Sequence, residues 1–465
     1  ASADHLSKKP KKFMDAIVKY PFKYLPIKNR VIQPPALTPY EITTNFPLAK
    51  THETDKQSIS ETIQRIMSDS SLWSVLIFDG KDLIVKEINP KLERIAREVD
   101  DLGQIDPRKI TLPPGLARRD LNGNGVIEKD EVAGLKYWRK FFEGMDCDSN
   151  EQVSGAELAW FKSGIGCPGT VLREGKRLRY PLVSASTAKS YVGFLMGHAI
   201  CEGHIKNLDE KVSNYLSYLK REGKESVFNK GQTFRDMINM RAGHPYIWAT
   251  YKTPEQFASN IKFGYMRRIG RYSLTVKKAI KMTDGLRVGV KKYQYDNILT
   301  DIVANAIDQS VGNEGMRAFF KKYITEAAGT KHPVVYRTDK QGWTIGMGML
   351  WAHPMDYLRI AIMISKSWKS KSCIGDYLRH VYKEAPQLPS NAPMTRPVAN
   401  RYGAFWWVDN SQIKKAGFAS IEQRGHGGKR VTINLDTGAI LVLLAGRRDF
   451  DPKLIFSYFN KINRL

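Results

Sequence analysis

The chain has 465 residues, of which 42% are hydrophobic, and its formal net charge at pH 7 is +26. This length allows a large domain with an insert, and the absence of any run of about eighteen apolar residues excludes a membrane-spanning helix. The positive charge predicts an anionic partner or substrate, but the sequence has no zinc-ligand pairs and no aromatic RNA-binding signature, so we expect no nucleic acid.

Residues 1–70 are interpreted as a basic N-terminal extension that ends in a helix over residues 58–67. Its early lysines, interleaved with aromatic residues, indicate either a solubilising surface or peripheral contact with an anionic membrane or polymer. The chain starts with Ala-Ser-Ala-Asp, which is compatible with the mature end of an exported protein. We therefore expect an extracytoplasmic location, periplasmic or secreted.

Residues 71–104 should supply the first strands of the main domain. Two apolar segments between residues 73 and 88 flank the dipeptide Asp79-Gly80, which is typical of a hairpin turn.

Residues 105–165 are predicted to form a small calcium-binding insert. Residues 120–131 follow the twelve-residue calcium-loop pattern, with Gly125 at the sharp turn and Ile127 as the apolar pairing residue. A hard cation needs six or seven oxygen ligands, and this spacing supplies them from one short segment. The predicted ligands are Asp120, Asn122, Asn124, the carbonyl of Val126, Glu128 and Glu131.

A second loop at residues 146–157 follows the same pattern with one departure. Its predicted ligands are Asp146, Asp148, Asn150, the carbonyl of Gln152, Ser154 and Glu157, and Val153 is its pairing residue. Glu151 stands where glycine is preferred, and a positive φ there costs about 1 kcal/mol. Both loops resemble EF-hand loops, joined by a short helix over residues 132–145. We expect one or two structural Ca²⁺ ions and no organic cofactor.

The remaining residues, 166–465, mix helical and strand patterns. Helices are predicted over residues 187–202, 233–240, 297–310, 315–324, 355–368 and 452–463, and a hairpin over residues 430–444. Because strands open and close the chain, we predict an α/β (α+β) fold, in which an antiparallel sheet flanked by helices accompanies a helical subdomain.

The four cysteines do not have the spacing of a metal site. Cys147 and Cys167 are close enough in sequence to bridge, whereas the apolar surroundings of Cys201 predict a buried free thiol. This pattern alone leaves the redox compartment open.

Ser186 and Lys189 form the most informative motif. Residues three apart share a face of a helix, so the lysine amine would lie beside the serine hydroxyl at the positive end of the helix. The same spacing recurs at Ser217, Ser259 and Ser411, but only the copy at Ser186 opens an apolar helix. A lysine at the start of a buried helix needs a partner or a chemical role, and here it can activate a serine nucleophile.

Two later motifs complete a pattern. Tyr295-Asp296-Asn297 precedes an apolar helix, and Gly425-His426-Gly427-Gly428 leads into a strand. In this order the three motifs resemble the serine β-lactamase and penicillin-binding-protein superfamily, in its class C-like branch of esterases, D-aminopeptidases and short-amide hydrolases. The resemblance covers residues 71–104 and 170–465, and it implies a β-lactamase-like fold around the calcium insert.

The resemblance implies a role for each motif. Ser186 would be acylated, Lys189 would carry protons, and Tyr295 would be a general base whose phenol pKa is lowered by Lys189. Asn297 would bind the acyl-side amide or hold Lys189. The triplet His426-Gly427-Gly428 would replace a Lys-Thr-Gly triplet on the strand at the edge of the site, and the backbone N–H groups of Ser186 and Lys429 would form the oxyanion hole.

The triplet departs from the family pattern, because a histidine stands where β-lactamases and transpeptidases hold a substrate carboxylate with lysine and a hydroxyl. We therefore expect a small or oligomeric ester or amide substrate, anionic if the basic segment 262–292 lines the cleft. D-amino-acid peptidase, penicillin-binding-like peptidase and β-lactamase activity are the alternatives. A catalytically inactive binding protein on the same fold is a further one, which the presence of all four motif residues disfavours.

Overall fold

The computed structural model describes residues 57–90, 112–135, 151–158, 184–219, 225–244, 284–311, 316–334, 344–389 and 399–462, apart from a few single positions. Some isolated residues and the backbone of a few further helix and strand residues are also described. Within these residues, no helix is both long and apolar enough to cross a membrane.

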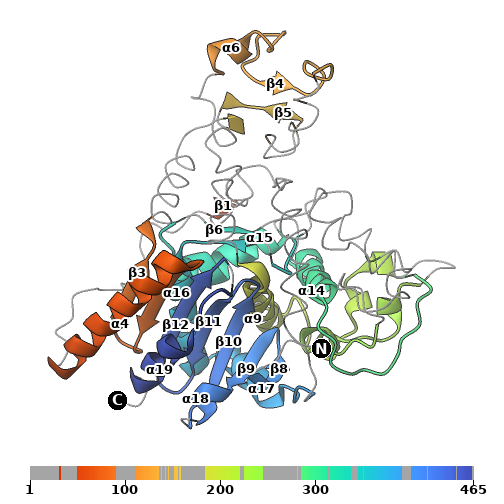
Figure 1. Cartoon of the computed structure of the whole chain (residues 1–465). Helices are drawn as coiled ribbons and strands as arrows, with labels where there is room; N and C mark the ends of the chain where they lie inside the picture. The colour runs from red at the N-terminus through yellow and green to blue at the C-terminus, as the bar shows by residue number, and fades with distance from the viewer. Residues whose placement is uncertain are drawn as a thin grey trace, which may run out of the picture.

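A seven-stranded antiparallel sheet forms the centre of the molecule, in the order β3-β2-β12-β11-β10-β9-β8 (Figure 1). Its strands are β2 (Leu72–Phe78), β3 (Leu83–Ile88), β8 (Ala399–Gly403), β9 (Trp406–Asn410), β10 (Ser420–Gly425), β11 (Lys429–Asn434) and β12 (Ile440–Ala445). Strand β12 pairs with β2, with Val442 opposite Leu76, so the two ends of the chain build one sheet. The predicted sheet and both predicted hairpins are therefore confirmed.

Helices cover both faces of the sheet because alternate strand residues point to opposite sides. On one face, α4 (Lys50–Asp69), α18 (Ser411–Lys415) and α19 (Lys453–Ile462) pack over an apolar cluster that includes Leu441 and Leu443. Ile59, Ile63 and Met67 of α4 belong to this cluster, so α4 packs on the sheet although the predicted domain boundary lies at residue 70.

On the other face, the largest apolar cluster joins the sheet to the helical part of the chain. Its helices are α9 (Ala188–Cys201), α10 (Phe234–Ile238), α14 (Asn297–Ser310), α15 (Gly315–Phe320), α16 (Pro354–Lys369) and α17 (Cys373–Glu384), with a π-helical segment at Lys321–Glu326. The predicted helices coincide with these elements to within a few residues, whereas α17 was not predicted. The nucleophile helix α9 begins after a 3-10 turn, η2 (Ala185–Thr187).

Three short strands and one insert complete the described elements. Strands β1 (Val31–Ile32), β6 (Val334–Tyr336) and β7 (Leu350–Trp351) form a small sheet. The insert contains α6 (Pro114–Ala117) and a two-stranded sheet of β4 (Ile127–Glu128) and β5 (Gln152–Val153), and Figure 1 shows it at the top, away from the main sheet.

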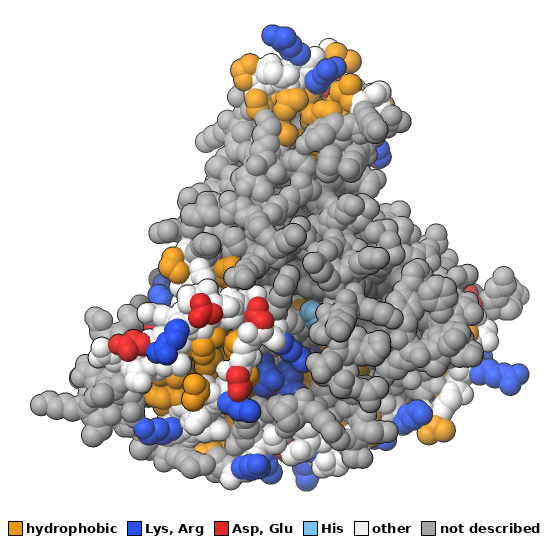
Figure 2. Space-filling model, in the orientation of Figure 1, with side chains coloured by type: hydrophobic (Ala, Val, Ile, Leu, Met, Phe, Trp, Pro, Cys, Tyr) orange, Lys and Arg blue, Asp and Glu red, His pale blue; other side chains and the backbone are white. Residues whose placement is uncertain are grey.

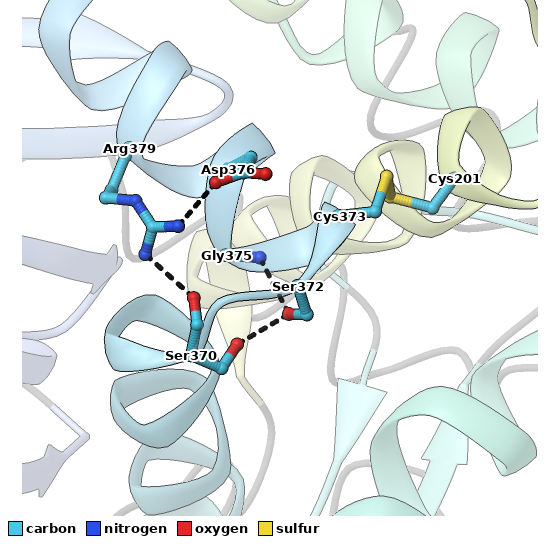
Figure 3. Close-up of a disulfide and its surroundings, with 7 residues drawn as sticks. All are labelled: Cys201, Ser370, Ser372, Cys373, Gly375, Asp376 and Arg379. Carbon is cyan, nitrogen blue, oxygen red and sulfur yellow. Dashed lines mark hydrogen bonds and ion pairs between the residues drawn. A yellow bond between two sulfur atoms is a disulfide. The ribbon is translucent and has the colours of Figure 1, made fainter.

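The prediction of a free thiol at Cys201 is wrong. Cys201, at the end of α9, forms a disulfide with Cys373, the first residue of α17 (Figure 3). The two cysteines are 172 residues apart in sequence, so local spacing gave no indication of the pair. A second contact joins the two helices, because the hydroxyl of Tyr377 on α17 donates a hydrogen bond to the carbonyl of Gly193 on α9. Cys147 and Cys167 lie outside the described residues.

Candidate active site

The nucleophile turn holds Ser186 at the start of α9, next to the end of strand β10. Ser184 anchors the turn, because its N–H donates to the carbonyl of Leu350 at 2.7 Å. Ala185 has a φ of +46°, which is unusual for a residue with a side chain and often marks a functional turn. Ser186 itself is half-buried and its hydroxyl faces Lys189.

Two glycines allow other segments to approach this turn closely. A Cβ added at Gly425 would lie 2.4 Å from the carbonyl oxygen of Ser184, and one at Gly348 would lie 3.0 Å from the carbonyl of Ala185. Strand β10 and the segment before β7 can therefore touch the nucleophile turn only because these positions lack side chains.

Lys189 lies beneath Ser186, is 1% exposed and donates a hydrogen bond to its hydroxyl at 2.9 Å. It also donates to the carbonyl of Met347. Burial lowers the pKa of Lys189 to about 7, although the carboxylates of Asp301 and Asp296 oppose this shift. At neutral pH much of the amine is therefore neutral and can accept a proton.

Tyr295 completes the group around Ser186. Its ring is buried, its hydroxyl hydrogen-bonds with Ser186, and the Lys189 ammonium lies 5.2 Å from its ring centroid. Burial raises the pKa of the Tyr295 phenol, and the hydrogen bond from Ser186 offsets only part of that. The expected lowering of this pKa by Lys189 is wrong, because burial disfavours the charged phenolate more than its neighbours stabilise it.

Asn297 is the first residue of α14 and is buried two positions after Tyr295. Between them, Asp296 caps the helix, since its side chain accepts from the N–H of Ile298. Asp296 also meets Nε2 of His244 at 3.1 Å, and both side chains are fully buried. These contacts fix the Tyr295–Asn297 segment at the start of α14 and tie it to His244, in the segment after α10.

The predicted triplet His426-Gly427-Gly428 forms the turn between β10 and β11 instead of lying on a strand. Gly425, one residue earlier, is the position that packs against the nucleophile turn. Lys429 lies directly opposite Gly425 in register, and its amine donates to the carbonyl of Ala445 at 2.9 Å. Burial lowers the pKa of Lys429 to about 7.

Sequence reasoning missed two groups near Ser186, the carbonyl of Met347 and the carboxylate of Asp301. The carbonyl of Met347 binds Lys189, and Asp301 accepts from the N–H of Met347 at 3.0 Å, so this carboxylate positions the carbonyl. Trp407 stacks on Tyr295 with ring centroids 5.9 Å apart. An aspartate one turn into an apolar helix was the only available signal for Asp301, and it resembles many structural aspartates.

The two loops predicted to bind calcium, at residues 120–131 and 146–157, are described for the whole of the first and part of the second. Ile127 pairs with Val153 across the two loops. Gly125 has a φ of +85°, and Glu151, which replaces glycine in the second loop, has a φ of +65°. The helix predicted over residues 132–145 does not begin at residue 132. Residues 132–135 form a turn, and the described residues from 138 to 145 are helical.

Side chains of the first loop fold inward. The carboxylate of Asp120 accepts from the N–H groups of Asn124 and Gly125, and that of Glu131 accepts from Leu121 and Glu128. Oxygen donors of this kind suit Ca²⁺. Across the described part of the chain, however, no three acidic, histidine or cysteine side chains gather closely enough to hold a metal ion.

In the second loop, Glu157 is buried and accepts hydrogen bonds from both the N–H and the hydroxyl of Ser154. Asp146, Asp148 and Asn150 lie outside the described residues, as do the basic N-terminal segment and nearly all of residues 262–283.

Comparison with known proteins identifies a matching family model and solved structures of similar fold. The family model described as Beta-lactamase matches residues 180–455. A presumed 6-aminohexanoate-dimer hydrolase from Bacillus anthracis is 13% identical, with a TM-score of 0.50, over 97% of this chain and 88% of that one. EstCE1, a hydrolase with promiscuous acyltransferase activity, is 11% identical, with a TM-score of 0.51, over 89% of this chain and 100% of that one. A search of curated proteins finds no match.

Proposed function

The chain belongs to the beta-lactamase family of serine hydrolases, and from this premise we propose that it cleaves an ester or amide bond through an acyl-enzyme on Ser186. The observation that carries the proposal is the hydrogen bond between Ser186 and a buried lysine whose pKa is near 7. Burying a lysine amine costs folding free energy, so its burial here needs a chemical reason. The amine of Lys189 lies where it can take the proton of the Ser186 hydroxyl.

In the proposed reaction, the neutral amine of Lys189 takes the proton of the Ser186 hydroxyl as Oγ attacks the substrate carbonyl. Tyr295 keeps its proton because its pKa is raised, so its phenol donates a hydrogen bond and passes a proton from Lys189 to the leaving oxygen or nitrogen. Water then hydrolyses the acyl-enzyme by the reverse sequence. The N–H of Ser186 and a second N–H near Gly425 or Lys429 would stabilise the oxyanion.

A fluorophosphonate probe tests the nucleophile directly. We expect one label per chain on Ser186, none on Ser186→Ala, and full labelling of the matched Ser190→Ala, because the buried Ser190 hydroxyl donates to the carbonyl of Phe405. If folded wild-type protein is not labelled, the chain is a binding protein on a hydrolase fold and the proposal fails.

The class of bond needs a separate test. We expect hydrolysis of p-nitrophenyl esters or of amino-acid p-nitroanilides, and little turnover of the β-lactam nitrocefin, because a histidine turn replaces the lysine-bearing triplet. The two solved structures compared above are named as hydrolases, which supports this choice without identifying the substrate. Efficient nitrocefin turnover would instead assign the chain to the β-lactamases.

We also propose that the loop at residues 120–131 binds a structural Ca²⁺ ion, and that the loop at residues 146–157 binds a second one. The residues that would hold the first ion are Asp120, Asn122, Asn124, Val126, Glu128 and Glu131. The paired Ile127 and Val153 and the positive φ of Gly125 and Glu151 support the proposal. Calcium titration calorimetry should show binding to wild type and one site fewer in Asp120→Ala; no heat in wild type would refute it.

The Cys201–Cys373 disulfide supports an extracytoplasmic location, because disulfides persist in oxidising compartments. Alkylation of thiols in intact producing cells, followed by mass spectrometry, should find both cysteines unmodified and bridged. Free, alkylated cysteines in protein from the native source would contradict this location.

A further inference from the structure

The backbone of Met347 connects helix α9 to helix α14. Its carbonyl accepts a hydrogen bond from the amine of Lys189 on α9, and its N–H donates to the carboxylate of Asp301 on α14 at 3.0 Å. The side chain of Asp301 is completely buried. A single residue therefore presents its carbonyl to the proposed base and its N–H to a buried carboxylate.

Two glycines hold this residue in place. A Cβ added at Gly346 would lie 2.8 Å from Cγ2 of Val192 on α9 and 3.3 Å from the Cβ of Ala304 on α14. On the other side of Met347, Gly348 packs directly on the nucleophile turn. The backbone between the two glycines is wedged among closely packed elements, so the directions of its carbonyl and its N–H are fixed.

Acylation would create a positive charge at this place. When the amine of Lys189 takes the proton of Ser186 it becomes an ammonium, and at 1% exposure it gains little from water. Many of the lysines and arginines drawn in blue in Figure 2 lie on the surface, where solvent compensates their charge (Figure 2). The ammonium of Lys189 needs a counter-charge inside the protein instead. The side chains of Ser186 and Tyr295 beside it are uncharged at neutral pH and supply none.

Two carboxylates on the α14 side can supply that charge. Burial lowers the pKa of Lys189 to about 7, and the carboxylates of Asp301 and, more weakly, Asp296 limit this shift. Asp296 also caps α14 and meets Nε2 of His244, so those contacts set its position. Asp301 is the carboxylate whose hydrogen bond leads, through one backbone residue, to the amine itself.

We infer that Asp301 is a positioning residue and the counter-charge of the proposed base: it fixes the carbonyl of Met347 against the amine of Lys189 and stabilises the ammonium that forms when Ser186 is acylated. This inference rests on the proposed hydrolase function. The step moves one proton, from Oγ of Ser186 to Nζ of Lys189, and Asp301 stays ionised throughout.

Asp301→Asn tests the charge, because the amide keeps an oxygen that can accept from the N–H of Met347. The carboxylate raises the pKa of Lys189, so its loss should lower the pH midpoint of fluorophosphonate labelling of Ser186 by at least about half a unit. The maximal labelling rate at high pH should fall at least about threefold, because a weaker base removes the serine proton more slowly. A purely structural role would lower the whole profile and leave its midpoint in place.

Asp308→Asn is the matched control. Asp308 lies on the same helix, and its carboxylate also accepts from a backbone N–H of the neighbouring segment, that of Thr344 at 3.3 Å. Among the described residues, however, burial, Asp301 and Asp296 set the pKa of Lys189, and Asp308 does not contribute. The control loses the same charge and should keep the wild-type midpoint. An unchanged midpoint in folded Asp301→Asn, or an equal shift in Asp308→Asn, would overturn the inference.

NMR of protein labelled with ¹³C at the lysine ε-carbon separates this inference from the hydrolase proposal, because it follows the amine without any reaction. The signal that is missing from Lys189→Met should titrate near pH 7 in wild type and in Asp308→Asn, and at lower pH in Asp301→Asn. If Ser186 is never labelled but this order holds, the hydrolase proposal fails and the counter-charge stands. If Ser186 is labelled and the amine titrates alike in all three proteins, the counter-charge alone is refuted.

A measurement on wild type applies even if Asp301→Asn does not fold. In protein labelled with ¹³C at the aspartate carboxyl, at least one signal should shift as Lys189 titrates near pH 7, and this shift should be absent from Lys189→Met. If no aspartate signal follows the titration of Lys189, Asp301 is not its counter-charge.

Discussion

At the scale of single residues, burial decides the chemistry of the site. Lys189 and Tyr295 are ordinary residues in the sequence, and both become buried when α9 and α14 pack together. Burial disfavours the charged form of each, so the amine loses its proton more easily and the phenol retains its own. These shifts support the proposal that Lys189 is the base and Tyr295 the proton donor.

This assignment predicts the pH dependence of acylation. The amine of Lys189 accepts a proton only when neutral, so kcat/KM for an uncharged ester should rise as pH increases, with a midpoint near 7. Lys189→Arg should abolish turnover, because a guanidinium stays protonated. Lys429 also has a pKa near 7, and the Lys429→Met variant should keep the same midpoint. A flat profile in wild type would contradict the role of Lys189.

Gly425 provides a steric test at the same scale. An alanine there would place its Cβ against the carbonyl of Ser184, and the end of β10 would have to shift. We expect Gly425→Ala to slow fluorophosphonate labelling of Ser186 by about tenfold or more, since overpacking costs about 1–3 kcal/mol. Gly134→Ala, whose added Cβ meets no atom within 4 Å, should label normally. Normal labelling of both variants would show that this contact is unimportant.

At the scale of elements, the helices α9 and α17 act as one unit. The Cys201–Cys373 bridge joins their ends, and the hydrogen bond from Tyr377 to Gly193 joins them further along. Ser372 caps α17 by accepting from the N–H of Gly375, and Arg379 pairs with Asp376 on the same helix (Figure 3). The nucleophile end of α9 is held separately, by Ser184 and Met347.

The bridge should therefore affect stability more than activity. We expect the double variant Cys201→Ser/Cys373→Ser to lose about 2–4 kcal/mol of unfolding free energy in urea, because the bridge restricts the unfolded chain. Its initial rate on an ester should stay within about twofold of wild type, since distant sites are largely independent. An unchanged unfolding free energy in the double variant, or an ester hydrolysis rate that falls well below wild type when the bridge is removed, would contradict this view.

At the scale of the whole molecule, the chain combines a sheet built from both ends with an insert that has its own apolar cluster. Ile127, Val132, Trp138 and Val153 belong to that cluster, which is separate from the two clusters on the sheet. Ligand binding to such a unit should stabilise it without altering the distant catalytic group.

We therefore predict that a calcium chelator lowers the melting temperature of the insert. Calcium at one hundred times its dissociation constant would contribute about 2.7 kcal/mol. Glu131→Gln, which keeps only the second proposed site, should lose part of this calcium-dependent stabilisation, and the labelling rate of Ser186 should not change with or without calcium. Identical melting curves of wild type with calcium and with chelator would remove the structural role.

The sequence predicted much of the fold because its signals are local. Alternating and continuous apolar runs marked β2, β3, β11 and β12, and helical periodicity marked α9, α14 and α16. Strand β9 was not predicted, because its short apolar run ends in the polar residues Asp409 and Asn410, although all five of its residues are buried. Helix α17 carries Tyr377, Leu378 and Val381 at helical spacing, so its signal was present and was overlooked.

By itself the sequence determined the Ser186–Lys189 spacing and the twelve-residue loop at Asp120, because each motif lies within a few residues of one element. Only the tertiary structure decided the pairing of Cys201 with Cys373, the protonation states of Lys189 and Tyr295, and the contact between Gly425 and the nucleophile turn. These properties depend on which segments that are far apart in the sequence pack together and exclude water. Spacing in a sequence gives the direction of neighbouring side chains, whereas burial and long-range contact arise only when the sheet and helices close around the site.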